Sequence, residues 1–264
     1  MFSDRISYKK ERILRILVHL KNGSIVTGSG FFINNNAQLL TCFHVVFGEE
    51  LRNIRTNQDF ISITGDNEHS KLGTWFTNKI NKIEVEFSDT SKEELGLKKF
   101  DEKFDIALLE LKNEKFLKKI KYCQLNFKDT LRQGDLVFFA GFPICFPYKN
   151  TDTPFAINTG MVSSFPETII GGEKYEHVQI NSINLGGNSG APLFRKNRDK
   201  VIGIINGNLS FKNDNVLFQN PQNNQTIRGS LQTPLSIAYA TPLKLLKISS
   251  TIFTPDRRRI NRKA

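Results

Sequence analysis

Cysteine is scarce in this 264-residue chain, which has three: Cys42, Cys123 and Cys145. Three thiols cannot all pair, and small domains held by disulfides carry a much higher density of cysteine. The composition therefore excludes a disulfide scaffold, and we expect these side chains to act as small buried hydrophobic groups.

Long apolar runs are also missing. No segment approaches the roughly 20 apolar residues of a membrane-spanning helix, so we predict no membrane span. The N-terminus lacks the hydrophobic stretch of a signal peptide, because charged residues interrupt it: Arg5, Lys9, Lys10, Glu11, Arg12 and Arg15. We therefore expect no signal peptide and a cytoplasmic location.

Acidic residues are outnumbered, with 26 Asp and Glu against 37 Lys and Arg and a net charge of +11. Part of this excess lies in a basic tail, residues 254–264, which could bind nucleic acid or an acidic partner. The tail has no interleaved aromatic residues and no nucleic-acid motif. We therefore expect a solvated tail and no nucleic-acid partner.

What the sequence does contain is a glycine-rich turn around a serine, Leu185–Leu193 (LGGNSGAPL). Glycines allow positive φ angles and the close approach of other groups. A serine at the tip of such a turn can face a substrate, while the N–H groups of Gly187 and Ser189 can converge on one oxygen atom as an oxyanion hole. An ordinary tight turn would have a similar composition, so the interpretation depends on the rest of the chain.

A serine nucleophile needs a base to take its proton. His44 is the best candidate among four histidines, because it stands where an apolar strand ends and a turn or short helix begins. His19 and His177 are expected on strands, and His69 lies in a polar loop.

The base in turn needs an acid to orient it. Asp105 heads an apolar run that ends at Leu111, and an ionised carboxylate at such a site needs a hydrogen-bonding partner. Asp101 is a rival. Along the chain the three candidates come in the order His44, Asp105, Ser189. One of the folds that carry a Ser-His-Asp triad uses this order.

Short motifs form a series along the chain. The segments are Gly28–Ile33, Leu40–Val46, Asp105–Leu109, Gly134–Asp135, Gly141–Pro143, Thr159–Ser163, Gly187–Leu193, Val201–Ile204 and Ala238–Pro242. In this order they resemble the trypsin/chymotrypsin superfamily, and most closely the HtrA/DegP-type protease domain. The resemblance covers about residues 12–248 and includes no PDZ-like domain.

This resemblance implies an all-β, chymotrypsin-like fold. We expect two six-stranded antiparallel β-barrels, residues 12–120 and 121–240, and a C-terminal helix over residues 241–250. It also implies a serine endopeptidase that forms an acyl-enzyme, with protein or peptide substrates, no cofactor or metal, and a possible regulatory protein partner.

Three residues depart from the usual patterns. Ala191 replaces the second glycine after the serine, which a negative φ would allow. Asn206 stands where the family often has Ser or Thr beside the aspartate, and its amide could still donate to Asp105. Asn188 replaces the aspartate that pairs with a released N-terminus in trypsin-like zymogens, so we predict control by loop ordering, not N-terminal cleavage.

The resemblance also implies a specificity pocket. Its walls would be formed by Ile183 on one side and by Ile205, Asn206, Gly207 and Asn208 on the other. No acidic residue stands at its base, so we expect a preference for small or medium apolar side chains.

Short apolar segments separated by turns predict strands throughout the chain. They are residues 13–20, 24–33, 38–41, 60–64, 72–76, 83–87, 105–111, 136–140, 155–164, 175–183, 191–195, 201–206, 216–219 and 236–240. A capping-box pattern predicts a helix over residues 91–98. The stretch 208–230 is expected to be a loop or extended hairpin beside the pocket, where it could gate access. A C-terminal helix should start at Thr241-Pro242.

Three alternatives stay open at this point. The chain could be a catalytically silent protease-fold binding module, because an unformed oxyanion hole leaves no mark in a sequence. It could be an esterase or another acyl hydrolase, since the chemistry is shared. It could also be a nucleic-acid-associated protein that uses its positive charge.

Overall fold

The computed structural model describes residues 10–48, 78–144, 154–170, 172–219 and 226–246. The strands expected at residues 60–64 and 72–76, Cys145 and the basic tail lie outside these ranges. None of the helices in the described ranges is long and apolar enough to cross a membrane.

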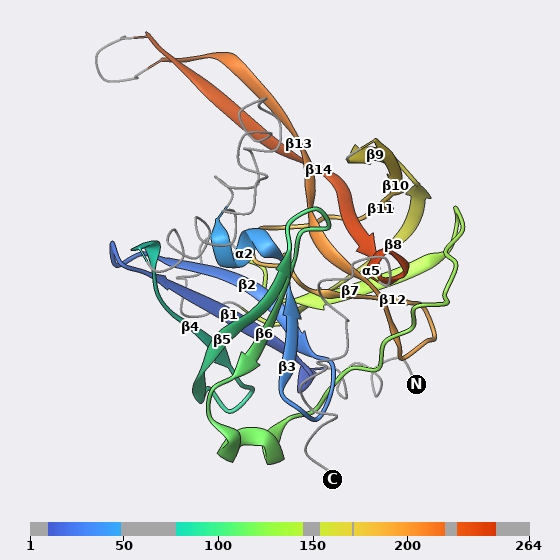
Figure 1. Cartoon of the computed structure of the whole chain (residues 1–264). Coiled ribbons are helices and arrows are strands. Elements are labelled where there is room, and N and C mark those ends of the chain that lie inside the picture. Colours follow the sequence, from blue (N-terminus) through green and yellow to red (C-terminus); the bar gives the residue numbers. More distant parts are fainter. Residues whose placement is uncertain (1–9, 49–77, 145–153, 171, 220–225, 247–264) are drawn as a thin grey trace.

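The N-terminal half forms a closed antiparallel barrel (Figure 1). Its strands are β1 (Ile13–Leu20), β2 (Ile25–Phe32), β3 (Gln38–Thr41), β4 (Ile80–Glu86), β5 (Lys92–Asp101) and β6 (Ile106–Leu111). Their order around the barrel is β1-β2-β3-β6-β5-β4. The strand ladder closes on itself, so this barrel leaves no open sheet edge.

The C-terminal half forms a second closed antiparallel barrel, in the order β11-β14-β13-β12-β7-β8. Its strands are β7 (Leu136–Gly141), β8 (Ala156–Ser164), β11 (Val178–Asn181), β12 (Pro192–Arg195), β13 (Val201–Gln219) and β14 (Thr226–Pro242). A separate hairpin, β9 (Glu167–Ile170) with β10 (Glu173–Glu176), takes part of the strand expected at residues 175–183. The predicted pair of six-stranded barrels is thus confirmed.

Phenylalanine fills much of the first barrel. The short helix α2 (Phe43–Phe47) is buried along its whole length, and the Phe43 and Phe47 rings stack with centroids 4.4 Å apart. Burying such a side chain contributes about 1.5–3 kcal/mol. This packing fixes α2, and therefore His44, against the barrel. Cys42 and Cys123 are buried, as expected.

The helix predicted for residues 91–98 is wrong, because this segment belongs to strand β5. Leu95 is 2% exposed and pairs with Ile83 of β4 and Leu111 of β6. The Ser91 hydroxyl, which a capping box would direct to a backbone N–H of the helix, donates to Asp89. Pairing with two neighbouring strands and burial of Leu95 outweigh the local helix signal.

The remaining helices are short. A 3₁₀ helix, η3 (Glu114–Lys119), lies between the barrels in sequence. The C-terminal helix α5 is described as Leu243–Leu246. Pro242 still belongs to β14, and the Thr241 hydroxyl donates to the Phe104 carbonyl at 3.2 Å. The helix therefore begins slightly after its predicted start, because Thr241 and Pro242 still belong to β14.

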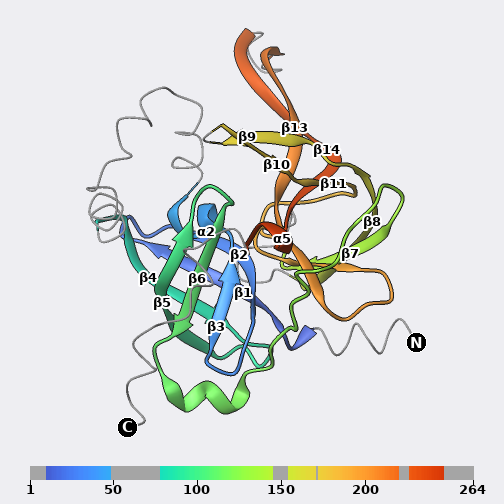
Figure 2. The same ribbon diagram turned by 45° about the vertical axis from the view of Figure 1, so that its right-hand side comes forward.

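The stretch expected as a loop or extended hairpin at residues 208–230 is part of a long two-stranded arm. Strands β13 and β14 pair from Gly203↔Pro242 out to Gln219↔Thr226. In Figures 1 and 2 this arm projects from the second barrel. Of the two expected alternatives, the described residues therefore form the hairpin.

Candidate active site

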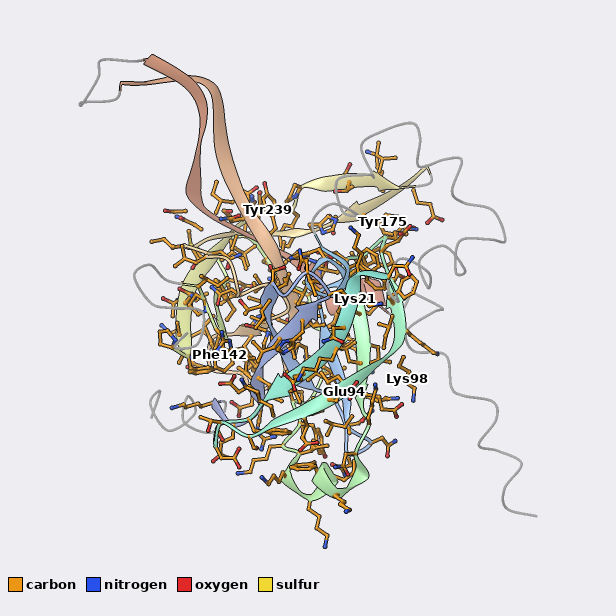
Figure 3. The ribbon with its side chains drawn as sticks, turned by 90° about the vertical axis from the view of Figure 1, so that its left-hand side faces the viewer. Lys21, Glu94, Lys98, Phe142, Tyr175 and Tyr239 are labelled. Carbon is orange, nitrogen blue, oxygen red and sulfur yellow. The ribbon has the colours of Figure 1, made fainter. Side chains whose placement is uncertain are left out.

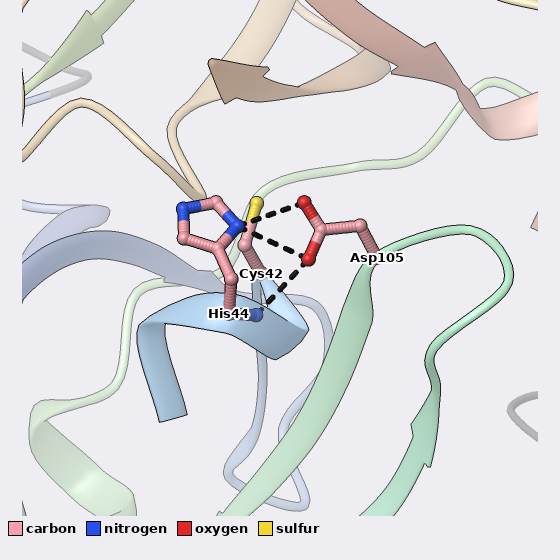
Figure 4. Close-up of side chains that lie close together, drawn as sticks. All are labelled: Cys42, His44 and Asp105. Atoms are coloured by element: carbon pink, nitrogen blue, oxygen red, sulfur yellow. Dashed lines mark hydrogen bonds and ion pairs between the residues drawn. The ribbon is translucent and has the colours of Figure 1, made fainter. Parts of the chain in front are cut away.

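His44 and Asp105 face each other at the end of the first barrel (Figure 4). His44 Nδ1 lies 2.8 Å from Asp105 Oδ2 and 3.1 Å from Oδ1. The backbone N–H of His44 also donates to Oδ1 at 3.0 Å. Both residues are buried, at 6% and 5% exposure. The carboxylate thereby holds the imidazole with Nδ1 toward itself and leaves Nε2 on the far side of the ring.

Asp105 adopts a left-handed backbone conformation with φ of 57°. Its N–H donates to the Glu102 carbonyl at 3.1 Å, which closes the turn before β6. Aspartate tolerates this region better than most residues, because its short polar side chain can bond locally. The turn thus ends with the carboxylate aimed at α2 just as β6 begins.

Asn206 supports the carboxylate from the second barrel. Its Nδ2 donates to Asp105 Oδ2 at 3.3 Å. Ile205 pairs with Ala240 and Gly207 with Tyr239, so Asn206 is an extra residue in β13. Such a bulge changes the direction of a side chain beside an active site. The contact expected from the sequence between this amide and Asp105 is present.

Ser189 stands at the tip of a turn that requires glycine on both sides. Gly187 and Gly190 have φ of 90° and 88°. A Cβ atom at Gly190 would lie 2.0 Å from the Ser29 carbonyl oxygen. Ala191 is not among the residues with positive φ, so its methyl group causes no backbone strain. The Ser189 hydroxyl lies 3.5 Å from the Asn206 carbonyl oxygen.

Ser29, on β2 of the first barrel, ties this turn in place. Its hydroxyl donates to the Gly187 carbonyl at 2.7 Å and accepts from the Phe142 N–H at 2.9 Å. Its own N–H donates to the Ser189 carbonyl at 2.8 Å. The Ser29 side chain is completely buried. Ser29 belongs to the motif Gly28–Ile33, but no sequence pattern reveals its bond to a residue 158 positions away.

The proposed oxyanion-hole groups are available. The Gly186 carbonyl accepts from the Ile144 N–H at 2.6 Å, so the Gly187 N–H, on the opposite side of that peptide, points away from Ile144. Within the described residues, neither the Gly187 nor the Ser189 N–H has a hydrogen-bond acceptor. Both can therefore donate to an added group.

The residues predicted to line the pocket differ in accessibility. Ile183 is 60% exposed, whereas Ile205 is fully buried in the second core. The Ile205 N–H donates to the Ala191 carbonyl and its carbonyl accepts from the Gly190 N–H. Ile205 therefore offers no free group to a substrate in this structure. The Asn206 amide is directed to Asp105, which leaves Gly207 and Asn208 on that wall.

Asn184 joins the two walls and was missed by sequence reasoning. Its Nδ2 donates to the Gly207 carbonyl at 2.8 Å, and Asn208 Nδ2 donates to the Asn184 carbonyl at 3.0 Å. Asn184 is 2% exposed. A single buried asparagine in a loop carries no signal that would have identified this bridge.

Cys42 lies beside the two catalytic candidates, and its thiol donates to the Ile205 carbonyl at 3.2 Å. Ligand atoms of Cys42, His44 and Asp105 lie within 4.8 Å of one another. A metal ion bound there would have to replace the hydrogen bonds between His44 and Asp105. The group therefore fits a histidine–carboxylate pair better than a cation site.

Two sequence comparisons agree on one class of proteins. A family model for the trypsin-like peptidase domain matches residues 28–204, a range that includes Ser29, His44, Asp105 and Ser189. A DegP-like periplasmic serine endoprotease of Buchnera aphidicola is 30% identical over 157 residues, covering 59% of this chain and 30% of that protein. Serine protease HTRA1 of Xenopus laevis is 28% identical over 197 residues, covering 73% and 34%. The chain spans about a third of the length of these relatives.

The solved structures agree on the fold. One, an HtrA-type protease with a tripeptide, matches with a TM-score of 0.58 and 17% identity, covering 95% of this chain and 63% of that one. At this identity the match concerns the fold alone. The family match over residues 28–204 shows that the chain belongs to the trypsin-like peptidase family, within which it is similar to DegP-like and HTRA1 proteases.

Proposed function

We propose that this chain is a serine endopeptidase that cleaves peptide bonds through an acyl-enzyme. The observation that carries the proposal is the position of Asn206, which connects the parts of the site. Its amide donates to Asp105, which holds His44, while its carbonyl lies 3.5 Å from the Ser189 hydroxyl. One bulged residue thereby links the carboxylate–imidazole pair to the serine.

In the first step, Ser189 Oγ attacks the scissile carbonyl carbon while His44 Nε2 accepts the hydroxyl proton. Asp105 keeps the Nδ1 proton of His44 directed toward itself and stabilises the imidazolium that forms. His44 then gives the proton to the leaving amine. Water attacks the acyl-enzyme with His44 again acting as base, which releases the acid and restores Ser189.

The N–H groups of Gly187 and Ser189 stabilise the oxyanion of each tetrahedral intermediate. Such donors must be in place before charge develops, since reorganisation during the reaction would cost energy. Ser29 supports this arrangement through its hydrogen bonds to the Gly187 and Ser189 carbonyls. We assign Ser29 a positioning role, because it acts on the turn and not on the substrate.

Substrate side chains before the scissile bond would contact Ile183, Gly207 and Asn208. Ile183 is exposed and apolar, which agrees with the predicted preference for small or medium apolar side chains. The Asn184 bridge places amide groups on the facing wall. Control by loop ordering or by a protein partner remains part of the proposal.

Asn188 gives a physical basis for such control. This side chain is 1% exposed, and neither its Oδ1 nor its Nδ2 has a hydrogen-bond partner in the described part of the chain. An unpaired buried amide costs about 1–3 kcal/mol. A rearranged nucleophile turn that pairs this amide would regain that energy, so a partner needs little binding energy to shift the turn.

Turnover of a fluorescence-quenched unfolded protein tests the proposed function. Ser189→Ala and His44→Ala should each lower kcat by about 10⁴–10⁶-fold. Ser163→Ala is a matched control, because Ser163 lies on β8 and its hydroxyl donates to the Gln179 carbonyl of β11, not to any group of the proposed site. It should keep wild-type turnover. Equal turnover by wild type and Ser189→Ala would refute the mechanism.

A further inference from the structure

The turn between β5 and β6 is strained at Asp105 itself. Asp105 has φ of 57°, and a residue other than glycine keeps such a conformation only where its surroundings hold it. On the C-terminal side, strand β6 fixes the backbone, because Ile106 pairs with Asp101 of β5. On the N-terminal side Asp105 follows Phe104. The direction of the carboxylate therefore depends on what holds Phe104.

Phe104 is held by two elements that are distant in sequence. Its side chain is 2% exposed, and its carbonyl accepts a hydrogen bond from the Thr241 hydroxyl at 3.2 Å. Its ring meets the ring of Tyr175 edge-on, with centroids 5.2 Å apart and planes at 80°. Aromatic rings prefer this arrangement, because the positive edge of one ring faces the negative face of the other. The residue before Asp105 is thus in contact with both β14 and β10.

Tyr175 attaches the β9–β10 hairpin to this turn. Among the residues of β9 and β10 whose exposure the structure describes, only Tyr175 is buried, at 5% exposure. A two-stranded hairpin alone is at best marginally stable in water, so we expect the burial of this ring to keep the hairpin in place. In Figure 3 the labelled Tyr175 lies where the hairpin meets the end of the first barrel.

Lys103 adds a positive charge to the contact between the two rings. Its Nζ lies 4.1 Å from the centroid of the Tyr175 ring and 5.3 Å from that of Phe104. Such a cation is attracted by the negative face of an aromatic ring. Lys103 also donates to the Tyr175 hydroxyl and forms an ion pair with Glu173 at 3.6 Å. The two residues that precede Asp105 therefore both contact Tyr175.

We propose that Tyr175 is a positioning residue for Asp105 and acts through Phe104. The inference rests on the proposed function, in which Asp105 orients His44. The Tyr175 ring keeps Phe104 fixed, and the carboxylate then keeps its hydrogen bonds to His44. Without this ring the strained turn relaxes and carries the carboxylate away from the imidazole. A displacement of about 1 Å is enough to lower catalysis by about 100-fold.

Turnover of the fluorescence-quenched unfolded protein by the full chain tests this role. Tyr175→Leu keeps an apolar side chain at the buried position and removes the contact between the rings. It should lower kcat by about 10–100-fold with little change in KM, because the Asn206 amide still supports Asp105. Tyr175→Phe keeps the ring without its hydroxyl and should retain wild-type kcat. Phe138→Leu is the matched control, since it removes one ring of another buried stack, with the Phe194 centroid at 5.0 Å.

A double-mutant cycle shows whether Tyr175 acts through Phe104. Phe104→Leu alone should lower kcat about as much as Tyr175→Leu, and the double variant should be no worse than either. Residues that act independently would instead multiply their losses. A multiplied loss would therefore overturn the proposed route.

A spectroscopic signal of the hydrogen bond between His44 and Asp105 separates positioning from general destabilisation. In protein labelled with 15N-histidine, the His44 Nδ1 proton should give a low-field resonance, because it is held by a carboxylate. Wild type, Tyr175→Phe and Phe138→Leu should show this resonance, and Tyr175→Leu should lose it. The signal does not need turnover. If wild type were inactive, its loss in Tyr175→Leu alone would still support the positioning role, so the two proposals fail separately.

Wild-type kcat in a folded Tyr175→Leu variant would overturn the positioning role. So would an unchanged His44 resonance in that variant, or its absence from wild type. An equal loss of kcat in Phe138→Leu, at a similar fall in Tm, would also overturn it, because destabilisation would then explain the effect. Should Tyr175→Leu not fold, Tyr175→Met provides the same readouts, since its flexible side chain fills more of the vacated volume.

Discussion

Ser29 shows at the residue scale how one hydroxyl can control the nucleophile turn. It bridges the Gly187 carbonyl and the Phe142 N–H, and both groups come from loops of the second barrel. Ser29 itself lies on β2 of the first barrel. The position of the proposed oxyanion hole therefore depends on a contact between the barrels.

Ser29→Ala should lower kcat by about 10–100-fold with little change in KM, because it loosens the oxyanion donors without removing them. The inhibition constant of a peptide boronate, which mimics the tetrahedral intermediate, should rise in parallel. Ser182→Ala serves as control, since Ser182 is also buried and donates to the Thr159 carbonyl. If Ser29→Ala raised KM and left kcat unchanged, the positioning role would be wrong.

The sequence predicted the residues whose chemistry restricts their type. His44 and Asp105 were paired because a serine needs a base and the base needs a carboxylate, and their hydrogen bonds are present. Asn206 was expected to reach Asp105 and does so. Asn184 was missed because its hydrogen bonds to Gly207 and Asn208 depend on the path of two loops. The roles of these residues in catalysis remain predictions.

At the scale of elements, the β4–β5 turn gives a stability test. The Asp89 carboxylate accepts hydrogen bonds from the Ser91 hydroxyl and N–H and from Lys119 of η3. The hydrogen bond from the Ser91 hydroxyl, followed by that from Lys119, lowers the pKa of Asp89 to about 2 from its ordinary 3.8. A lowered pKa in the folded state means that the ionised carboxylate stabilises the fold.

Asp89→Asn should therefore lower Tm at neutral pH. The stabilisation is complete above the ordinary pKa of 3.8 and is lost as the pH falls to about 2. The difference in Tm between wild type and variant should shrink over that window. Thermal melts followed by circular dichroism at pH 6, 4, 3 and 2 measure it. A difference that stays constant down to pH 2 would show that the turn does not depend on this charge.

Elements with local signals were predicted best. Strand β3 has its predicted bounds, Gln38–Thr41. Strand β5 was missed because its segment has a local helix-start pattern, and only pairing with β4 and β6 makes it a strand. For residues 208–230 the sequence favours a loop or an extended hairpin without deciding between them, because the polar β13 segment gains its structure by pairing with β14.

The two barrels explain at the scale of the molecule why the site lies where it does. His44 and Asp105 come from the first barrel, whereas Ser189 and Asn206 come from the turn before β12 and from β13. The order of short motifs predicted this double barrel only through the family resemblance that it carries, and the structure confirms the two barrels. The cytoplasmic location stays a prediction.

The proposed mechanism depends most directly on an activated serine at position 189. A fluorophosphonate probe with mass spectrometry measures this in wild type, Ser189→Ala and His44→Ala. We predict a modified Ser189 in wild type, no label in Ser189→Ala and labelling at least about 100-fold slower in His44→Ala. Label on another residue, or labelling of Ser189 at the same rate without His44, would contradict the account.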